Sequence, residues 1–497
     1  MADKKRNVKI KPVKSERFNV NKHGTFTGGS SVGCKVLCFF QVFSVLLPTI
    51  IILLAYGSYR LYEAVTYVPE LPKVDLNFWW GPNTTDPRDT SIRPYKIIFS
   101  DAMESEFRWM AESYRGSPKK KSFEDSAWEY GVNSEAFSQF FSYWIFKYSF
   151  RDRARFLNQF DQFKTNIQGL DIHYIHVKPQ VPENVKVIPL LLLHGWPGSV
   201  REFYEAIPLL TTSRPGYDFV FEVIVPSLPG FIFSQAPTRP GLSPFQIAII
   251  MRNLMHRLGH KQYYVQGGDF GHSIGSNMAT IFPNEILGFH TNLPINVSKW
   301  SAMTWLLGAV WPTFVFGKQA GKMYPLTDKA KFYMEEFAYM HLQDTKPDSI
   351  GIALNDSPFG LAAYLLDRLM VFTDPQNKNA PDGGLEKYFS YDKLLDNIML
   401  YWISGSITTA MRLYKETIAK AVEEQTLALI PTQVPTWGLR FKHELVHSPD
   451  FVLRWKYLNL IGTTNLEYGG HFAAFERPEE FSEDIFKAVK AFMAFRK

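Results

Sequence analysis

The chain has 497 residues and a mass of 57.2 kDa, which allows a large buried core and excludes a small disulfide-stapled scaffold. Hydrophobic residues make up 46% and charged residues 21%, so a disordered or collagen-like chain is excluded as well. The net charge of +6 comes from residues 1–35, which hold nine Lys/Arg and two Asp/Glu; the rest, with 45 basic and 46 acidic residues, lacks the excess expected of a nucleic-acid-binding protein.

An uncharged apolar run of 21 residues covers residues 36–56. As a helix it would be about 31 Å long, which matches a bilayer core of about 30 Å. A cleaved signal peptide is the alternative, but its apolar region would be shorter and would follow a shorter basic start. We therefore expect a single uncleaved transmembrane helix. The two cysteines, Cys34 and Cys38, lie at its start, so the body offers no cysteine ligand for zinc.

The body shows short β-rich runs, bounded by Gly or Pro, that alternate with helical patterns. Such runs suit strands buried on both faces of a largely parallel sheet, and the alternating order predicts an α/β domain. The expected strands are residues 171–177, 187–193, 221–226, 262–266, 432–439 and 458–466, and the expected helices are residues 200–210, 244–258 and 478–495.

Three stretches lack this rhythm. Residues 68–94 are rich in Pro and Trp and predict a linker, while residues 101–164 and 297–430 read as helical. The expected parts are a basic tail (1–35), an anchor (36–56), a linker with an N-terminal wrapping region (57–180), a first core part (181–296), a helical lid (297–430) and a second core part (431–497).

A strand at residues 262–266 runs into the sequence GGDFG (267–271) and then a helical segment. Strand, tight glycine turn and helix are the arrangement of a nucleophile elbow, with Asp269 at its centre. The rival is Ser273, since GHSIG (271–275) fits the G-x-S-x-G pattern of an esterase. Because an elbow nucleophile follows its strand at once, Asp269 is favoured over Ser273, and a purely structural glycine turn is the third interpretation.

An aspartate nucleophile points to its own class of substrate. A carboxylate that attacks an sp³ carbon forms an ester, which water can then hydrolyse at the carbonyl of Asp269. A serine would form a stable ether instead. The elbow therefore indicates alkyl transfer from an epoxide or a halide.

Hydrolysis of the ester needs a base, an acid that orients it and an oxyanion hole. His471 follows the last expected strand, where this architecture places its base, and Glu444 and Asp450 are the candidate acids after the preceding strand. The loop HGWPG (194–198) follows another strand, so the backbone N–H groups of Trp196 and Phe270 are the expected oxyanion donors.

The chain closely resembles the microsomal and juvenile hormone epoxide hydrolases from about residue 79 to its end. The resemblance is carried by WWGP, LLLHGWPGS, PSLPGFIFS, VQGGDFG, DSPFGLAAY and GGHFAAFERPEEF. It implies an α/β-hydrolase fold with a helical lid, and it places the nucleophile, acid and base on Asp269, Glu444 and His471. Its two lid tyrosines fall on Tyr339 and Tyr414. Phe270 stands where the family more often has Trp.

The resemblance also implies a membrane-anchored enzyme of the endoplasmic reticulum that converts lipophilic epoxides and water to diols. Its partners are the epoxide and membrane lipid, with no nucleic acid, no metal and no cofactor. Tyrosine, with a pKa of about 10, is acidic enough to protonate an alkoxide whose parent alcohol has a pKa near 15.7. The apolar residues 300–316 would line a tunnel or face the membrane.

Other interpretations stay open. A haloalkane dehalogenase shares the aspartate chemistry but needs halide-holding donors in place of the tyrosines, and a Ser273 esterase or a non-catalytic membrane scaffold are further classes. The excess of basic residues before the anchor favours a body outside the cytosol. The resemblance favours a cytosolic body, which is the orientation we expect.

Overall fold

The computed structural model describes residues 31–83, 89–117 and 119–496, with side chains from residue 44 onward. Helix α1 (Ser31–Thr66) belongs to one compact unit, and the body from Val68 forms another. Within α1, Ser44–Thr66 is long and apolar enough to cross a membrane. The helix continues through Pro48 and beyond the predicted end at residue 56. Residues 1–30 of the expected basic tail and the side chains of Cys34 and Cys38 lie outside the described part.

The body is built around one nine-stranded sheet in the order β1-β2-β3-β5-β4-β6-β7-β8-β9. Neighbours from β1 to β5 are antiparallel, and those from β5 through β4 to β9 are parallel. The strands are β1 (Arg93–Tyr95), β2 (Gln162–Ile167), β3 (Leu170–Val177), β4 (Lys186–Leu193), β5 (Phe219–Pro226), β6 (Tyr263–Gly267), β7 (Ile286–Thr291), β8 (Thr436–Arg440) and β9 (Leu460–Asn465).

Helices cover both faces of the parallel part. Tyr264 of β6 stacks on Phe492 of α20 (Pro478–Phe495), whereas a Cβ added to Gly275 of α7 (Phe270–Ile281) would lie 3.2 Å from Val265. Because successive side chains of a strand point to opposite faces, α20 and α7 lie on opposite sides of the sheet. Helix α5 (Ala206–Thr211) packs on α20 and α6 (Pro244–Arg257) packs on α7. The α/β layers expected from the sequence are therefore confirmed.

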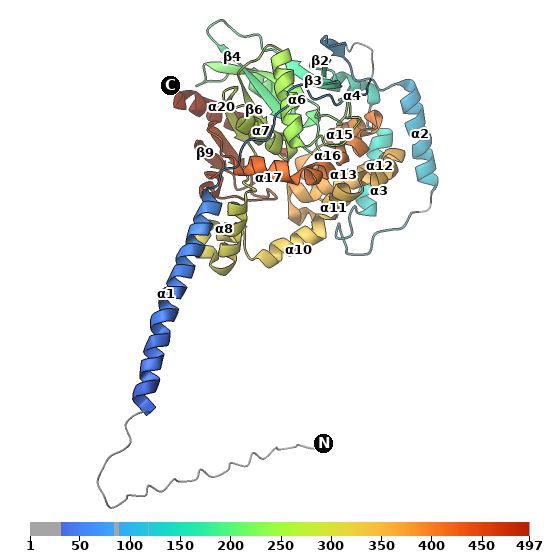
Figure 1. Cartoon of the computed structure of the whole chain (residues 1–497). Helices are drawn as coiled ribbons and strands as arrows, with labels where there is room; N and C mark the ends of the chain where they lie inside the picture. The colour runs from blue at the N-terminus through green and yellow to red at the C-terminus, as the bar shows by residue number, and fades with distance from the viewer. Residues whose placement is uncertain (1–30, 84–88, 118, 497) are drawn as a thin grey trace, which may run out of the picture. The chain divides into compact units, whose positions relative to one another are not determined.

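The remaining helices precede the parallel strands, follow β4 (η1, Val200–Phe203), interrupt the sheet between β7 and β8, or follow β8. Figure 1 shows many of the interrupting helices together in yellow and orange. They are α2 (Asp101–Gly116), α3 (Ser134–Phe146), α4 (Phe150–Leu157), η1 (Val200–Phe203), α8 (Lys299–Val310), α9 (Pro312–Phe316), η2 (Gly317–Lys322), α10 (Leu326–Glu336), α11 (Ala338–Thr345), α12 (Pro347–Asp356), α13 (Pro358–Thr373), η3 (Pro375–Asn379), α14 (Leu385–Tyr388), α15 (Tyr391–Ser404), α16 (Ile407–Ala419), α17 (Ala421–Leu429), α18 (Asp450–Leu453) and α19 (Ala473–Glu476).

Strand β2 corrects the sequence analysis, which extended a helical pattern to residue 164. Residues 162–167 pair with β3 as a hairpin, and its two-residue turn consists of Gln168 and Gly169, with φ of 50° and 86°. Two consecutive left-handed residues give the turn whose twist fits a hairpin. Strand β7 was also missed, because its run is short and carries Gly288, where a Cβ would come within 2.2 Å of the Phe492 ring.

A buried carboxylate joins three parts of the body. Asp396 of α15, in the interrupting region, accepts hydrogen bonds from Nε of Arg153 of α4 and Nε of Arg201 of η1, each over 2.8 Å, and from the Tyr148 hydroxyl over 3.1 Å. Removing one partner from such a buried pair costs about 3–5 kcal/mol, because the other charge remains buried. The network therefore fixes α4, η1 and α15 relative to one another.

Candidate active site

Asp269 stands between the end of β6 and the start of α7. Its φ of 51° and ψ of −128° lie in a region that residues with a side chain rarely adopt. The turn also needs Gly271, since a Cβ there would lie 2.2 Å from the carbonyl oxygen of Leu193. This strained turn places the Asp269 carboxylate at the carboxyl edge of the sheet.

The loop after β4 meets Asp269 because β4 and β6 are parallel neighbours, with Leu193 opposite Gly267. The Trp196 N–H donates a hydrogen bond of 2.9 Å to Asp269 Oδ1. The approach requires Gly195, where a Cβ would lie 2.2 Å from the same oxygen. Trp196, on the loop after β4, thus lies next to the turn after β6 that carries Asp269 and Phe270. The backbone N–H groups of Trp196 and Phe270 are the expected oxyanion donors.

Helix α15 holds this loop from the other side. Asn397 Nδ2 donates to the carbonyl of Pro197 over 2.8 Å, and the Tyr401 hydroxyl donates to the carbonyl of Gly198 over 2.7 Å. Both donors are buried. The position of the Trp196 N–H therefore depends on α15, which lies about two hundred residues further along the chain.

His471 links Asp269 to an acid. It follows β9, and its Nε2 lies 3.5 Å from Asp269 Oδ2 while its Nδ1 lies 2.7 Å from Glu444 Oε1. Burial opposes protonation of the imidazole, but Glu444 and Asp269 raise the pKa of His471 well above its ordinary value. Burial alone would raise the pKa of Asp269, but His471 and the N–H groups of Trp196 and Phe270 hold it below its ordinary value.

The structure separates the alternatives that the sequence left open. Asp450 does not face His471: Arg440 Nη2 lies 2.7 Å from its Oδ1, and the Thr463 hydroxyl donates to Oδ2 over 3.0 Å. Ser273 lies inside α7, and among the described residues no histidine hydrogen-bonds to it. Geometry therefore brings Asp269, Glu444 and His471 together, whereas Ser273, although it lines a cavity with His471, makes no hydrogen bond to a histidine among the described residues.

The two tyrosines approach from the interrupting helices. Tyr339 of α11 stacks on the Trp196 ring with centroids 5.2 Å apart, and the ring of Tyr414 of α16 meets that of Phe270 edge-on at 4.8 Å. The two tyrosine rings lie 6.0 Å apart. Burial, with the negative charge of Asp269 adding to it, raises the pKa of both hydroxyls. Both tyrosines are therefore neutral and able to donate a proton at pH 7.

A cavity of about 190 Å³ opens beside these groups. Asp269, His471 and both tyrosines line it together with three further polar residues, Ser273, Asp344 and Thr417. The other lining residues are apolar: Phe270, Leu293, Phe337, Met340, Ile418, Leu445 and Val446. A carboxylate, an imidazole and two phenol hydroxyls thus converge on a site suited to a small apolar molecule.

Two glutamates near the site were missed by the sequence analysis. Both carboxyl oxygens of Glu476 accept backbone N–H groups beside His471, from Phe472 over 2.9 Å and from Gly470 over 2.8 Å, and so hold its loop. Burial raises the pKa of Glu476, and likewise that of Glu202, to about 8. The sequence signal for Glu476 was its place as the single acidic residue at the end of the apolar run HFAAFE. The signal for Glu202 was its position four residues after the expected oxyanion loop HGWPG.

A second, smaller cavity of about 20 Å³ lies on the other side of Asp269. It is lined by Glu202, Asn292, His471 and Asp269 among others, and its volume is sufficient for one water molecule.

Comparison with known families adds to this geometry. A family model described as "Epoxide hydrolase N terminus" matches residues 92–203, and one described as "alpha/beta hydrolase fold" matches residues 188–326. The juvenile hormone epoxide hydrolase of Bombyx mori is 47% identical over 443 residues, which are 88% of this chain and 96% of that protein. Epoxide hydrolase 1 of Sus scrofa is 41% identical over 426 residues, or 82% and 91% of the two chains.

Solved structures agree with the fold. The crystal structure of juvenile hormone epoxide hydrolase from the silkworm Bombyx mori superposes with a TM-score of 0.83 at 47% identity, covering 85% of this chain and 100% of that one. The structure of Aspergillus niger epoxide hydrolase gives a TM-score of 0.64 at 26% identity, covering 81% and 97%. The α/β-hydrolase fold expected from the sequence is confirmed.

Proposed function

The chain belongs to the microsomal and juvenile hormone epoxide hydrolase family and is an epoxide hydrolase, and we propose that it converts lipophilic epoxides to vicinal diols through a covalent ester of Asp269. The observation that supports this mechanism most is the chain of contacts from the Trp196 N–H through Asp269 and His471 to Glu444. Asp269 and His471 of this chain of contacts line the same cavity as both tyrosines.

In the first step, a carboxylate oxygen of Asp269 attacks one ring carbon of the epoxide, and the bond from that carbon to the ring oxygen breaks. Tyr339 or Tyr414 donates its proton to the departing oxygen, which leaves a hydroxyalkyl ester and a tyrosinate. The mostly apolar lining of the cavity favours binding of an apolar epoxide next to the carboxylate.

In the second step, water attacks the ester carbon of Asp269 while His471 takes its proton. The negative oxygen of the intermediate is held by the N–H groups of Trp196 and Phe270, and one such donor contributes about 3 kcal/mol. Collapse breaks the bond between the ester carbon and the alkyl oxygen. The alkyl oxygen takes the proton from His471 and the diol leaves, while the water's second proton passes from the Asp269 carboxyl to His471, which restores the carboxylate.

The charge of Asp269 couples the two steps. While Asp269 is a carboxylate, it raises the pKa of His471 and of both tyrosines. Ester formation removes that charge. The tyrosines are then stronger acids while the alkoxide forms, and His471 passes its proton to the resulting tyrosinate and becomes the base of the second step.

The small cavity behind Asp269 supports a site for the hydrolytic water. His471 and the carboxyl of Glu202 line it together with Asn292. With its pKa raised to about 8, the Glu202 carboxyl is largely protonated at pH 7 and can donate a hydrogen bond to that water. We assign Glu202 the role of a positioning residue in the second step.

The apolar cavity supports a lipophilic epoxide as substrate, either a foreign compound or a lipid-derived one. The relatives named juvenile hormone epoxide hydrolase make juvenile hormone a compound to include in a substrate panel. Diol formation from aromatic and lipid-derived epoxides by the purified protein would identify the preferred class.

Two features support a membrane location. Helix α1 contains the apolar stretch Ser44–Thr66, and relatives include a microsomal-type enzyme. On the body, α8 and α9 expose a row of large apolar side chains, which are Leu306, Leu307, Val310, Trp311 and Phe314. None of these lines the cavity beside Asp269. We therefore propose that this face contacts membrane lipid, in the endoplasmic reticulum, on its cytosolic side.

Replacing the base should trap the ester. The His471→Gln variant is expected to be alkylated by epoxide but to hydrolyse the ester at least about 10²-fold more slowly, because general-base catalysis of the second step is lost. Intact-mass measurement should show the protein heavier by one substrate molecule. The double variant with Asp269→Asn is the control and should stay unmodified. Normal turnover by His471→Gln without an adduct would remove His471 from the mechanism.

The tyrosine pair separates epoxide from halide chemistry. Replacing both Tyr339 and Tyr414 by Phe should slow diol formation by about 10²-fold or more, since the alkoxide loses its proton donors. Alkylation of Asp269 by a haloalkane, whose leaving group needs no proton, should be much less affected. Tyr364→Phe is the matched control: its ring lies 6.1 Å from Trp196, but it does not line the cavity. Equal loss with both substrates would contradict the assigned role.

Glycosylation tests the orientation of the body. Asn83 is exposed and begins an acceptor sequence whose Thr85 lies outside the described residues, whereas Asn296 is buried. With a cytosolic body, wild type and Asn83→Gln should migrate alike before and after glycosidase treatment. The Asn21→Thr variant, which creates an acceptor at Asn19 in the tail, should instead gain a glycan. A glycosidase-sensitive shift that Asn83→Gln abolishes would place the body in the lumen.

A further inference from the structure

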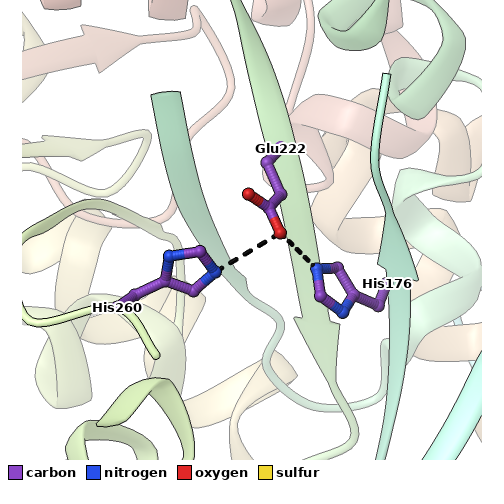
Figure 2. Close-up of side chains that lie close together, drawn as sticks. All are labelled: His176, Glu222 and His260. Atoms are coloured by element: carbon purple, nitrogen blue, oxygen red, sulfur yellow. Dashed lines mark hydrogen bonds and ion pairs between the residues drawn. The ribbon is translucent and has the colours of Figure 1, made fainter. Parts of the chain in front are cut away.

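A second group of titratable side chains lies outside the catalytic site. Figure 2 shows Glu222 between His176 and His260, with both imidazoles directed at the same carboxylate oxygen. His176 Nε2 lies 2.7 Å and His260 Nε2 lies 3.4 Å from Glu222 Oε1, and one donor atom from each residue falls within 4.8 Å of the others. All three side chains are largely buried, with 10 to 17% of their area exposed.

The cluster and the catalytic residues lie toward opposite ends of the parallel strands. His260 comes three residues before β6 begins, whereas Asp269 follows its end, and a five-residue strand spans roughly 16 Å. Glu222 lies in the first half of β5, and His176 is near the end of the antiparallel β3, opposite Ile224. No step of epoxide opening can use this group.

The cluster leaves one nitrogen unsatisfied. His260 Nε2 is buried, and no hydrogen-bond partner with acceptable geometry lies near it among the described residues. The cluster thus offers two imidazoles and a carboxylate, and the buried Nε2 of His260 makes no hydrogen bond. A cation bound by these three side chains would complete the set.

We propose that His176, Glu222 and His260 bind a divalent transition-metal ion, best matched by Zn²⁺, which ties β3, β5 and the loop before β6 together. Tetrahedral zinc, at about 2.0–2.1 Å from each donor, separates neighbouring donors by about 3.3 Å. The distance from His260 to Glu222 already fits, while His176 and Glu222 must move apart by about 0.6 Å, within reach of side-chain rotation. Water takes the fourth position.

Lys178 competes for the same carboxylate. Its Nζ lies 3.6 Å from Glu222 Oε1, but its side chain is 71% exposed. Because the ammonium group can turn into solvent, a bound ion would displace it with little loss, since exposed ion pairs contribute at most about 1 kcal/mol. Removing the lysine charge should therefore strengthen zinc binding. A Lys178 variant thus tests the proposal through increased zinc affinity rather than through lost binding.

The test is zinc titration of the untagged, metal-free full-length protein in detergent, in competition with a chromophoric chelator. Wild type should bind one more zinc ion per chain than His260→Gln and should show a zinc-dependent rise in its thermal midpoint that His260→Gln lacks. Lys178→Gln should bind that ion more tightly. His256→Gln is the matched control, because His256 pairs with Glu285 beside Arg252 and has no second histidine there; it should bind zinc as wild type does.

Epoxide hydrolysis, assayed in parallel, shows whether the zinc binding that is lost in His260→Gln belongs to this cluster or to the catalytic carboxylates. His260→Gln should retain wild-type turnover, which also shows that it is folded. X-ray absorption of the one-zinc protein should show two imidazole ligands. Equal zinc stoichiometry in wild type and His260→Gln, or unchanged affinity in Lys178→Gln, would overturn the proposal and leave the cluster as a hydrogen-bonded lock on the sheet edge.

Discussion

The negative charge of Asp269 is the constraint on which the rest of the site depends. It is held at the carboxyl edge of the sheet by a strained turn and by the Trp196 N–H, and it lies 3.5 Å from His471. The same charge raises the pKa of His471 and of the two tyrosines above the cavity. In the proposed mechanism, loss of this charge on ester formation makes the tyrosines stronger acids for the forming alkoxide and lets His471 release its proton and become the base of the second step. A single covalent event thus coordinates the acids and the base.

The scaffold contributes by holding the two loops that carry the backbone donors. Parallel pairing of β4 with β6 places both loops at one edge, and α15 fixes the loop of Trp196 through Asn397 and Tyr401. Asp396, next to Asn397, also binds Arg153 and Arg201. The helices that interrupt the sheet therefore do more than cover the cavity, because one of them positions the oxyanion donor.

Much of this arrangement could be predicted from the sequence, and the failures have physical reasons. The glycine turn around Asp269 and the apolar strand before it are local signals, so the elbow and the α/β order were predictable. The acid was ambiguous, because spacing cannot show that Arg440 and Thr463 occupy Asp450 and leave Glu444 for His471. Likewise Glu202 and the cluster around Glu222 depend on contacts between distant segments, whereas Glu476 accepts backbone N–H groups of its own loop. Strands β2 and β7 were missed because a short run with polar residues or glycine carries little periodicity.

The central claim, that Asp269 is alkylated and that water then attacks its ester carbon, is tested most directly by isotope labelling. A single turnover is run with excess enzyme in ¹⁸O-labelled water, and the diol and the peptide that contains Asp269 are analysed by mass spectrometry. The account predicts one ¹⁸O atom in the Asp269 carboxylate and an unlabelled diol, because the diol takes its new oxygen from Asp269. Label in the diol of the first turnover, with Asp269 unlabelled, would contradict it and show that water opens the epoxide directly.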